Sequence, residues 1–180
     1  MIKYVAARLL CAFCLVCLLT ACNSDGCKDV NCGLQGTCVD GDCECQAGFE
    51  IDEFGGCGQR TAEKLAGNYR VTSSTGQTPG CNTGEYTLIV QASPTRQDGL
   101  LILNLGQYVC SNNGDMIVSA TVKGPDRFDF DVDIRACNQY TMIGSGTWNE
   151  ADSSITLNYR AEYTLQGSQV VDECAATLQR

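Results

Sequence analysis

Cysteine offers this chain more possible chemistry than any other residue type. The 180 residues include 14 cysteines and no histidine. Thiols can pair as disulfides, bind metal ions as thiolates or act as nucleophiles. Without histidine, the chain cannot build a Ser-His or Cys-His relay to activate a nucleophile. The cysteines fall into four groups along the chain: Cys11, Cys14 and Cys17; Cys22; Cys27, Cys32, Cys38, Cys43, Cys45 and Cys57; Cys81, Cys110, Cys137 and Cys174.

The first 21 residues have the layout of an export signal. Lys3 and Arg8 give a basic start, and an apolar run over 9–19 follows that is too short to span a bilayer as a helix. The sequence Leu19-Thr20-Ala21-Cys22 resembles the lipobox of bacterial lipoproteins. This resemblance implies that residues 1–21 are removed as a signal peptide and that Cys22 carries acyl chains such as palmitate. An ordinary signal peptide would instead leave Cys22 as an exported thiol without a partner.

The lipoprotein resemblance also gives an expected location. The diacylglyceryl and amide-linked chains of lipoproteins would supply the two lipid signals that stable membrane attachment requires. Residues 22–26 would then be a lipidated tether. Asn23 follows the anchor, whereas an Asp there would resemble an inner-membrane retention signal. We therefore expect a lipid-anchored protein of the outer membrane, on its periplasmic or surface face, with the membrane as a partner through the acyl chains.

The net charge disfavours one class of partner. Removal of the signal peptide changes the formal net charge from −9 to −11, because two basic residues and no acidic residue are lost. An acidic protein is repelled by phosphate backbones. We therefore expect no nucleic-acid partner.

Six closely spaced cysteines define a small module over residues 27–58. Their spacing is C-x4-C-x5-C-x4-C-x-C-x11-C, with Gly48-Phe49 after the fifth cysteine. Six cysteines allow fifteen connectivities. The pattern resembles the EGF-like family, and the resemblance implies the disulfides Cys27–Cys38, Cys32–Cys43 and Cys45–Cys57. About thirty residues cannot enclose a sufficient apolar core, so such a module depends on disulfides.

Two metal sites are alternatives in this region. Zinc sites usually use C-x2-C pairs, often with histidine, and neither feature occurs here. Some EGF-like modules bind calcium just before the first cysteine, where Asn23 and Asp25 fit but Gly26 stands in place of Glu or Gln. A solvated segment is the simpler interpretation, so we expect no metal and no other cofactor. We likewise expect Glu50, Asp52 and Glu53 in a solvated turn.

Residues 61–180 have the pattern of a β domain. Thr61–Lys64 can begin a short helical turn. Within 127–134, Phe128, Phe130, Val132 and Ile134 alternate with Asp129, Asp131 and Asp133, which places the two sets on opposite faces of a strand. Similar runs, separated by turn residues, are 67–73, 85–91, 100–105, 116–123, 140–148, 155–163 and 174–178. The chain is therefore predicted to be mainly β, with an antiparallel β-barrel or β-sandwich of about eight strands after the EGF-like module.

Four cysteines in this domain allow two bridges in three connectivities. We expect Cys81–Cys174, which would tie the first strands to the last, and Cys110–Cys137, which would cross the middle strands. The segment Gly67-Asn68-Tyr69 resembles the opening of lipocalin-like domains, with Tyr69 at the position of their Trp. The whole arrangement is similar to bacterial lipoproteins of unknown function that join an EGF-like module to a small β domain, in which segments such as 81–86 and 144–148 recur.

Three functions remain open. We expect a non-enzymatic, lipid-anchored cell-envelope protein, an interaction, adhesion or structural module with the EGF-like unit as a spacer and a protein or glycan partner at the cell surface. The alternatives are a lipocalin-like carrier of a small apolar ligand and a carboxylate-dependent hydrolase that uses Asp129, Asp131 and Asp133. We interpret those three carboxylates as a solvated stripe. We interpret the aromatic side chains as packing residues and not as sugar platforms: Tyr86, Trp148, Tyr159 and Tyr163.

Overall fold

The computed structural model describes residues 26–76, 81, 84–110, 116–131, 135–137 and 139–180. The expected signal peptide, Cys22, Asn23, Asp25 and Asp133 lie outside these residues. Within the described ranges, no helix combines the length and apolar character needed to cross a membrane.

The N-terminal module, residues 26–60, consists of two small antiparallel ladders. Strand β1 (Gly36–Val39) pairs with β2 (Asp42–Cys45), and β3 (Phe49–Glu50) pairs with β4 (Gln59–Arg60). Disulfides join the six cysteines as the EGF-like resemblance implies: Cys27–Cys38, Cys32–Cys43 and Cys45–Cys57. Each joins residues 11 or 12 positions apart, and a loop of this size contributes about 3 kcal/mol in the chain-entropy model. The disulfides therefore supply the stability that so small an apolar core cannot provide.

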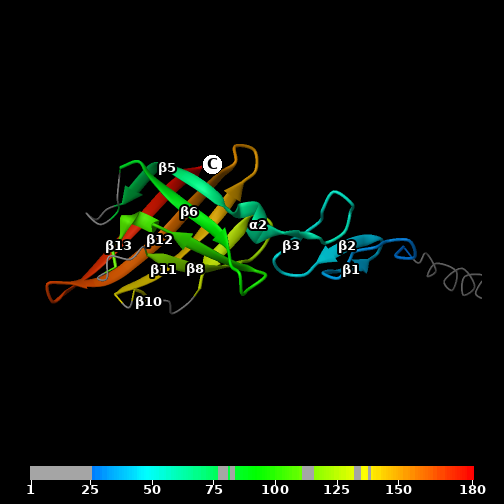
Figure 1. Cartoon of the computed structure of the whole chain (residues 1–180), viewed down its shortest axis with the longest axis horizontal. Coiled ribbons are helices and arrows are strands. Elements are labelled where there is room, and N and C mark those ends of the chain that lie inside the picture. The colour runs from blue at the N-terminus through cyan, green and yellow to red at the C-terminus, as the bar shows by residue number, and fades with distance from the viewer. Residues whose placement is uncertain (1–25, 77–80, 82–83, 111–115, 132–134, 138) are drawn as a thin grey trace, which may run out of the picture.

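The rest of the described chain forms a closed antiparallel β-barrel (Figure 1). Among the described residues, eight strands make its wall: β5 (Gly67–Gly76), β6 (Tyr86–Ala92), β7 (Gly99–Leu103), β8 (Ile117–Val122), β9 (Arg127–Phe130), β11 (Tyr140–Asn149), β12 (Ser154–Leu165) and β13 (Ser168–Gln179). Each pairs with the next along the chain, and β13 pairs back with β5. The short β10 (Arg135–Ala136) pairs with the start of β11. The barrel is confirmed, and the sandwich alternative is wrong.

The predicted β runs all become strands, although several of their limits differ. Leu105 is not in a strand, because Asn104 adopts a left-handed conformation and the chain enters the short helix η1 (Leu105–Gln107). Strand β9 ends at Phe130, so Asp131 is not in a strand, and the predicted positions Val132 and Ile134 lie outside the described residues. Strand β13 begins at Ser168, six residues before the predicted start at Cys174. The expected helical turn is α2 (Thr61–Leu65).

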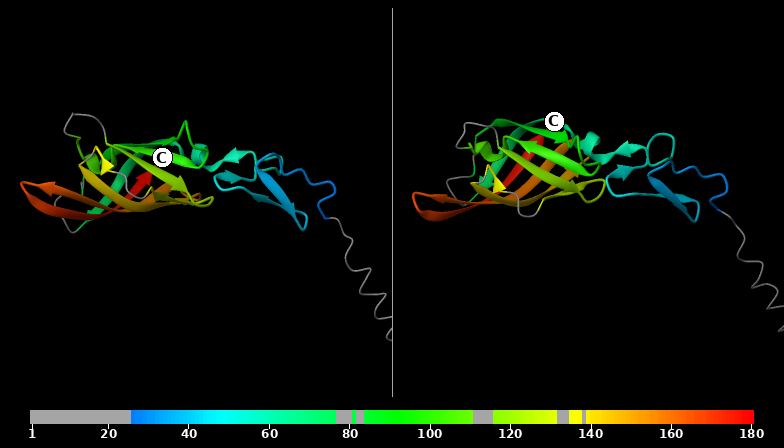
Figure 2. Two further views of the ribbon diagram at one scale, coloured as in Figure 1. Left: turned by 90° about the horizontal axis from the view of Figure 1, so that it is seen from below. Right: turned by 60° about the horizontal axis from the view of Figure 1, so that its bottom comes forward.

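The direction of the strands gives the barrel two distinct ends. The near end, beside the N-terminal module, carries α2 and the connections 93–98, 123–126 and 150–153. The far end carries the connections β5–β6, β7–β8 and β9–β11 and the tip of the long β12–β13 hairpin. Figures 1 and 2 show the module continuing from the near end, while the β12–β13 hairpin projects beyond the far end. The molecule is therefore elongated, with the module and the far end at opposite extremes.

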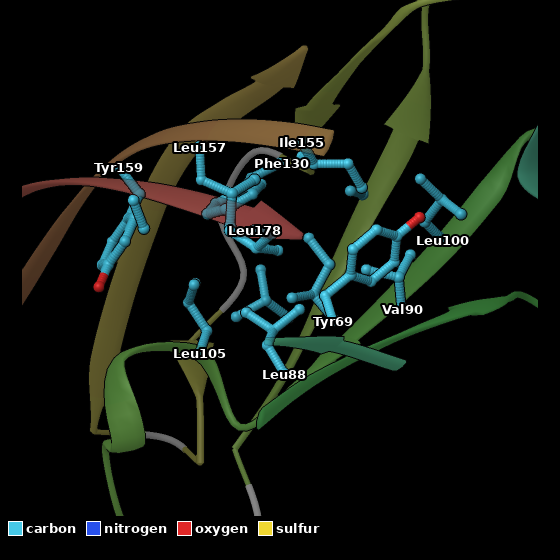
Figure 3. Close-up of a cluster of buried hydrophobic side chains, with 14 of the residues drawn as sticks. Tyr69, Leu88, Val90, Leu100, Leu105, Phe130, Ile155, Leu157, Tyr159 and Leu178 are labelled. Carbon is cyan, nitrogen blue, oxygen red and sulfur yellow. The ribbon is translucent and has the colours of Figure 1, made fainter. Parts of the chain in front are cut away.

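Large apolar side chains fill the barrel interior (Figure 3). Alternation along each strand sends every second residue inward, as with Leu88 and Val90 of β6 or Ile155 and Leu157 of β12. The largest fully buried side chains are Leu65, Tyr69, Leu88, Leu100, Ile102, Leu105, Met116, Phe128, Met142, Ile155, Leu157 and Leu178. They come from both ends and all sides of the barrel, so its central section is a packed core.

The barrel closes where β9 meets β11. Phe128 lies directly opposite Gly146, and a Cβ added to Gly146 would overlap the Phe128 ring. A Cβ on Gly144 would likewise lie 2.9 Å from the Phe130 ring. The two phenylalanine rings therefore cover glycine backbone on the neighbouring strand, an arrangement in which the glycines admit rings that larger residues would exclude.

Arg180 covers the near end of the core. Its guanidinium lies 5.4 Å from the ring centroids of both Tyr69 and Trp148, within cation–π range. It also donates hydrogen bonds to the carbonyls of Lys64 and Ala66, at 2.7 and 2.6 Å. Tyr69, at the lipocalin-like position, donates to the Leu65 carbonyl. These contacts tie β5, β11 and the last strand to α2.

Candidate functional site

A buried carboxylate lies at the far end of the barrel. Asp172 of β13 points inward, on the same face as Cys174, Ala176 and Leu178, and its side chain is 0 % exposed. The hydroxyls of Tyr108 and Tyr163 donate to its Oδ2, at 2.9 and 3.0 Å. Its Oδ1 is buried and has no hydrogen-bond partner among the described residues. Buried carboxylate oxygens normally have partners, so this atom marks a candidate site.

Three tyrosine rings lie against one another beside Asp172. The ring centroids of Tyr108 and Tyr140 are 5.1 Å apart, those of Tyr140 and Tyr163 5.3 Å, and those of Tyr108 and Tyr163 6.0 Å. Tyr108 follows η1, Tyr140 begins β11, and Tyr163 lies near the end of β12. All three rings are half-buried, whereas Asp172 is fully buried. We call Asp172 with these three tyrosines the far-end cluster.

Two further tyrosines lie deeper at this end. The backbone N–H of Gly106 donates to Tyr86 Oη at 3.0 Å. Gly106 has φ +61°, and a Cβ there would lie 2.6 Å from the Tyr108 ring and 2.8 Å from Tyr159 Oη. Tyr86 lies close enough to Tyr159 to affect its ionisation, although no well-formed hydrogen bond joins the two hydroxyls. Glycine at 106 therefore lets η1 pack between the tyrosines.

Burial and Asp172 keep the far-end tyrosines protonated. Burial, and then the hydrogen bond to Asp172, raises the pKa of both Tyr108 and Tyr163 above the ordinary tyrosine value. Burial raises the pKa of Tyr159, and the neighbouring Tyr86 raises it further. Protonated hydroxyls are the form that can donate hydrogen bonds to a carboxylate.

These raised pKa values predict a loss of stability in alkali. Above pH about 10 the unfolded chain loses its tyrosine protons before the native chain does, so the stability present below that pH falls as pH rises. Tyr159→Phe should make this fall shallower, because one raised tyrosine pKa is removed. Denaturant unfolding of both proteins between pH about 9 and about 11 measures the effect. If the free energy of unfolding fell equally steeply with pH in the wild type and in Tyr159→Phe, the prediction would be contradicted.

Both disulfides of the barrel lie at the far end. Cys81 is joined to Cys174, two residues from Asp172, and Cys110 is joined to Cys137, with Cys110 two residues from Tyr108. These are the two pairs expected from the sequence. They fix the β5–β6 connection to β13 and the β7–β8 connection to the β9–β11 connection. The loops that carry the far-end cluster are therefore held covalently.

The acidic residues singled out from the sequence lie elsewhere. Asp129 forms an ion pair with Arg127 at 3.1 Å, and Asp131 forms one with Arg96 at 2.6 Å. Both carboxylates are partly exposed, and neither belongs to the far-end cluster. No group of three acidic or cysteine side chains that could hold a metal ion occurs in the described part of the chain. Glu50, expected in a solvated turn, instead forms an ion pair with Lys64 at 2.8 Å.

Sequence reasoning missed the main residues of the far-end cluster. Tyr86, Tyr159 and Tyr163 were noted as packing residues, but Asp172, Tyr108 and Tyr140 were not singled out. The sequence did contain one signal. Alternate residues of a strand share a face, so Asp172 lies on the same buried face as Cys174, Ala176 and Leu178. The predicted strand began too late to include it.

A polar cavity of about 510 Å³ opens beside Tyr163. It lies between the ends of β11 and β12 and the tip of the β12–β13 hairpin. Its lining includes Thr141, Glu162, Tyr163 and Gln169. A larger open groove of about 650 Å³ lies on the outer wall, over β5, β11, β12 and β13. Strand alternation points Thr141, Glu162 and Gln169 to the outside of the barrel, so the smaller cavity lies on the opposite face of the sheet from Asp172.

Comparison with known proteins assigns no family. No family model matches the chain, and no curated protein matches it. A solved structure described as EF1p2_mFAP2b bound to DFHBI is similar over 67 % of this chain and 97 % of its own, with 17 % sequence identity and a TM-score of 0.42. A TM-score below 0.5 does not establish a shared fold, so that protein's ligand is not carried over to this chain.

Proposed function

We propose that the protein is a non-enzymatic, lipid-anchored binding protein of the cell envelope. Acyl chains on Cys22 hold it in the outer membrane, the EGF-like module is a spacer, and the far end of the barrel meets a protein or glycan partner. The observation that carries the proposal is the junction between the module and the barrel. The module joins the near end of the barrel, and polar contacts hold the two together (Figure 1).

Arg60 is the centre of that junction. Its guanidinium donates to the carbonyls of Ser93, Arg96 and Gln97, in the β6–β7 connection, at 3.0 to 3.3 Å. The Lys64–Glu50 ion pair adds a second contact, with both side chains mostly buried. The Thr61 N–H donates to the Gly48 carbonyl at 3.0 Å. The contacts printed between described residues of the two parts are polar, and they set the direction of the module, as a spacer requires.

The tether length fits this arrangement. Gly26 lies four positions after Cys22, and a fully extended chain over four positions reaches about 14 Å. The first residues of the module would then lie beside the membrane. Because the far end lies at the opposite extreme of the molecule, it would face away from the lipid (Figure 1).

The interior of the barrel favours binding at the far end over transport inside the barrel. A carrier of an apolar ligand needs an apolar cavity, whereas the central section here is occupied by large side chains (Figure 3). A hydrolase would need two carboxylates that converge, whereas Asp129 and Asp131 each pair with an arginine. The absence of histidine from the sequence also favours a non-enzymatic role.

The anchor is tested with Cys22→Ser. Wild-type protein should fractionate with membranes, and mass spectrometry should find an acylated N-terminal peptide that begins at Cys22. The serine variant should lose the acyl mass and leave the membrane fraction. An unacylated wild-type N terminus would refute the proposed anchor.

The spacer is tested at Arg60. Amide ¹⁵N relaxation of the acylated full chain in detergent micelles should report a single tumbling time for module and barrel. Arg60→Ala should free the module to reorient, because three hydrogen bonds across the junction are lost. Arg70→Ala is the matched control, since Arg70 pairs with Glu85 on the barrel wall and does not touch the module. Independent tumbling in the wild type would exclude a stiff spacer.

A further inference from the structure

The β12–β13 hairpin carries an open strand edge beyond the far end of the barrel (Figure 2). Strand β13 begins at Ser168, but its pairing with β5 begins only at Cys174, opposite Gly76. Between these points β13 pairs with β12 on one side, and no described residue pairs with it on the other. An open edge is a template on which another strand can form hydrogen bonds.

The hairpin register fixes which backbone groups face this edge. Residues directly opposite each other in an antiparallel ladder alternately exchange two hydrogen bonds or none. The two-residue turn makes Leu165 and Ser168 a hydrogen-bonded pair. Gln169 and Val171 therefore turn their N–H and C=O groups away from β12. These four groups form no backbone hydrogen bond within the described part of the chain.

The tip of this hairpin, residues 163–171, carries no charged residue, although the formal net charge of the chain is −9. Proteins usually protect an exposed edge with charged side chains or proline, and neither occurs in the hairpin tip. Two copies of an acidic chain repel each other through their net charge. A contact between copies is therefore favoured on an uncharged surface, and the hairpin tip is such a surface at one extreme of the molecule.

We propose that the hairpin tip pairs edge to edge with the hairpin tip of a second copy of this chain, and that the two copies are anchored in facing membranes. The two edges run antiparallel, with Val170 of one copy opposite Val170 of the other. Gln169 of each copy then lies opposite Val171 of the other. In this register the four open backbone groups of each copy satisfy one another through four hydrogen bonds.

The same register avoids repulsion between the copies. Asp172 lies opposite Ser168 of the second copy, and Glu173 lies opposite Gly167, so no acidic residue faces another. Pairing of β5 with β13 begins only beyond Glu173, past the turn of the second copy. The two barrel walls therefore do not overlap.

Antiparallel pairing also fixes how the two molecules are oriented. Strand β13 runs from the far end toward the near end, so two paired copies point in opposite directions (Figure 1). Their modules, and with them the proposed anchors at Cys22, lie at opposite extremes of the pair. Such a pair joins two facing membranes. Four hydrogen bonds make a weak contact, but many copies on each surface hold the membranes together by multivalency.

This inference rests on the proposed function and deepens it, because it names a second copy as the protein partner and adhesion as the role. Pairing of the tips is measured on the purified full chain in detergent micelles, whatever lipid the chain carries. A failure of the anchor experiment would therefore leave the pairing untouched. A failure of pairing would leave the anchor and the spacer untouched.

Val170 is the test position, because the register places it opposite itself. Val170→Lys and Val170→Glu each bring two like charges together, whereas a mixture of the two variants places Lys opposite Glu. In the wild type, the amide NMR signals of Gln169 and Val171 should shift with protein concentration. Each variant alone should need on the order of fivefold more protein, or more, for the same shift. Unlabelled Val170→Glu added to labelled Val170→Lys should restore the shift.

Thr164→Lys is the matched control. It adds the same charge to the hairpin tip, but on β12 and away from the open edge, and should pair as the wild type does. Val171→Pro is a second variant, which removes an N–H from the open edge without breaking a bond to β12. Strand edges tolerate proline at such positions. This variant should lose the concentration-dependent shift of Gln169.

Vesicle clustering tests the opposed orientation. The vesicles carry the protein by its acyl chains or, if it has none, through the Cys22 thiol coupled to a maleimide lipid. Wild-type vesicles should cluster, Val170→Lys vesicles should not, and a mixture of Val170→Lys and Val170→Glu vesicles should cluster again. The proposal is overturned if the wild-type signals do not depend on concentration, if Thr164→Lys pairs as weakly as Val170→Lys, if mixing the two charged variants restores nothing, or if wild-type vesicles stay dispersed.

Discussion

Replacing Phe128 with alanine is expected to lower the free energy of unfolding of the barrel by about 3–5 kcal/mol. Phe128 is 0 % exposed, and its ring covers Gly146 on the opposing strand. The substitution removes the buried ring and leaves a cavity at the junction of β9 and β11. Because β9 is only four residues long, few other contacts can hold this side of the barrel closed. Denaturant unfolding followed by Trp148 fluorescence measures the loss.

Phe54 provides the matched control for this prediction. It lies in the N-terminal module and is 87 % exposed, so Phe54→Ala should change stability by no more than about 0.5 kcal/mol. Gly146→Val tests the same contact from the other strand, because its side chain would occupy the space of the Phe128 ring. If Phe128→Ala and Phe54→Ala lowered the free energy of unfolding by similar amounts, the contact of Phe128 with Gly146 would not be critical for closing the barrel.

Removing the Cys81–Cys174 disulfide should cost about 4–5 kcal/mol in the chain-entropy model. The bridge joins residues 93 positions apart, so it restricts most of the unfolded barrel. The double variant Cys81→Ser/Cys174→Ser, which leaves no unpaired thiol at the site, should therefore unfold at much lower denaturant concentration. The other four disulfides stay in place, so the change in midpoint reports this bridge alone.

The Cys110–Cys137 bridge is the internal reference for that experiment. Its cysteines are 27 positions apart, and the same model gives about 3.5 kcal/mol. The double serine variant at 110 and 137 should thus lose less stability than the one at 81 and 174. The reverse order would mean that native-state contacts at the far end, and not loop length, decide what each bridge contributes.

The candidate site and both barrel disulfides lie together at the far end. Its loops must leave the regular sheet to carry Tyr108 and Tyr140, and irregular segments lose stability unless they are tied down. The bridges at Cys81 and Cys110 supply this restraint next to the cluster. The near end needs no bridge, because Arg180 and α2 hold it through hydrogen bonds and ring contacts. This division is consistent with a joint at one end and a binding face at the other.

Local patterns in the sequence were enough to predict the strands. The alternation of Phe128 and Phe130 with Asp129 and Asp131 marks a half-buried strand, because successive side chains of a strand point to opposite faces. The cysteine spacing of the module, through its resemblance to the EGF-like family, gave all three of its pairs. The alternation of apolar and polar residues and the spacing of the cysteines are both local patterns. They can therefore be read directly from a single sequence.

Tertiary structure alone decided how the sheet closes and what its far end contains. A barrel and a sandwich have the same alternation, and only the pairing of β9 with β11 and of β13 with β5 distinguishes them. The hydrogen bond from Tyr108 to Asp172 joins residues 64 positions apart. No local pattern records such a contact, because it depends on strand register and on loops such as η1 that depart from the regular sheet. The sequence by itself therefore determined the strands and the cysteine framework, whereas the folded barrel determined the buried carboxylate and its tyrosines.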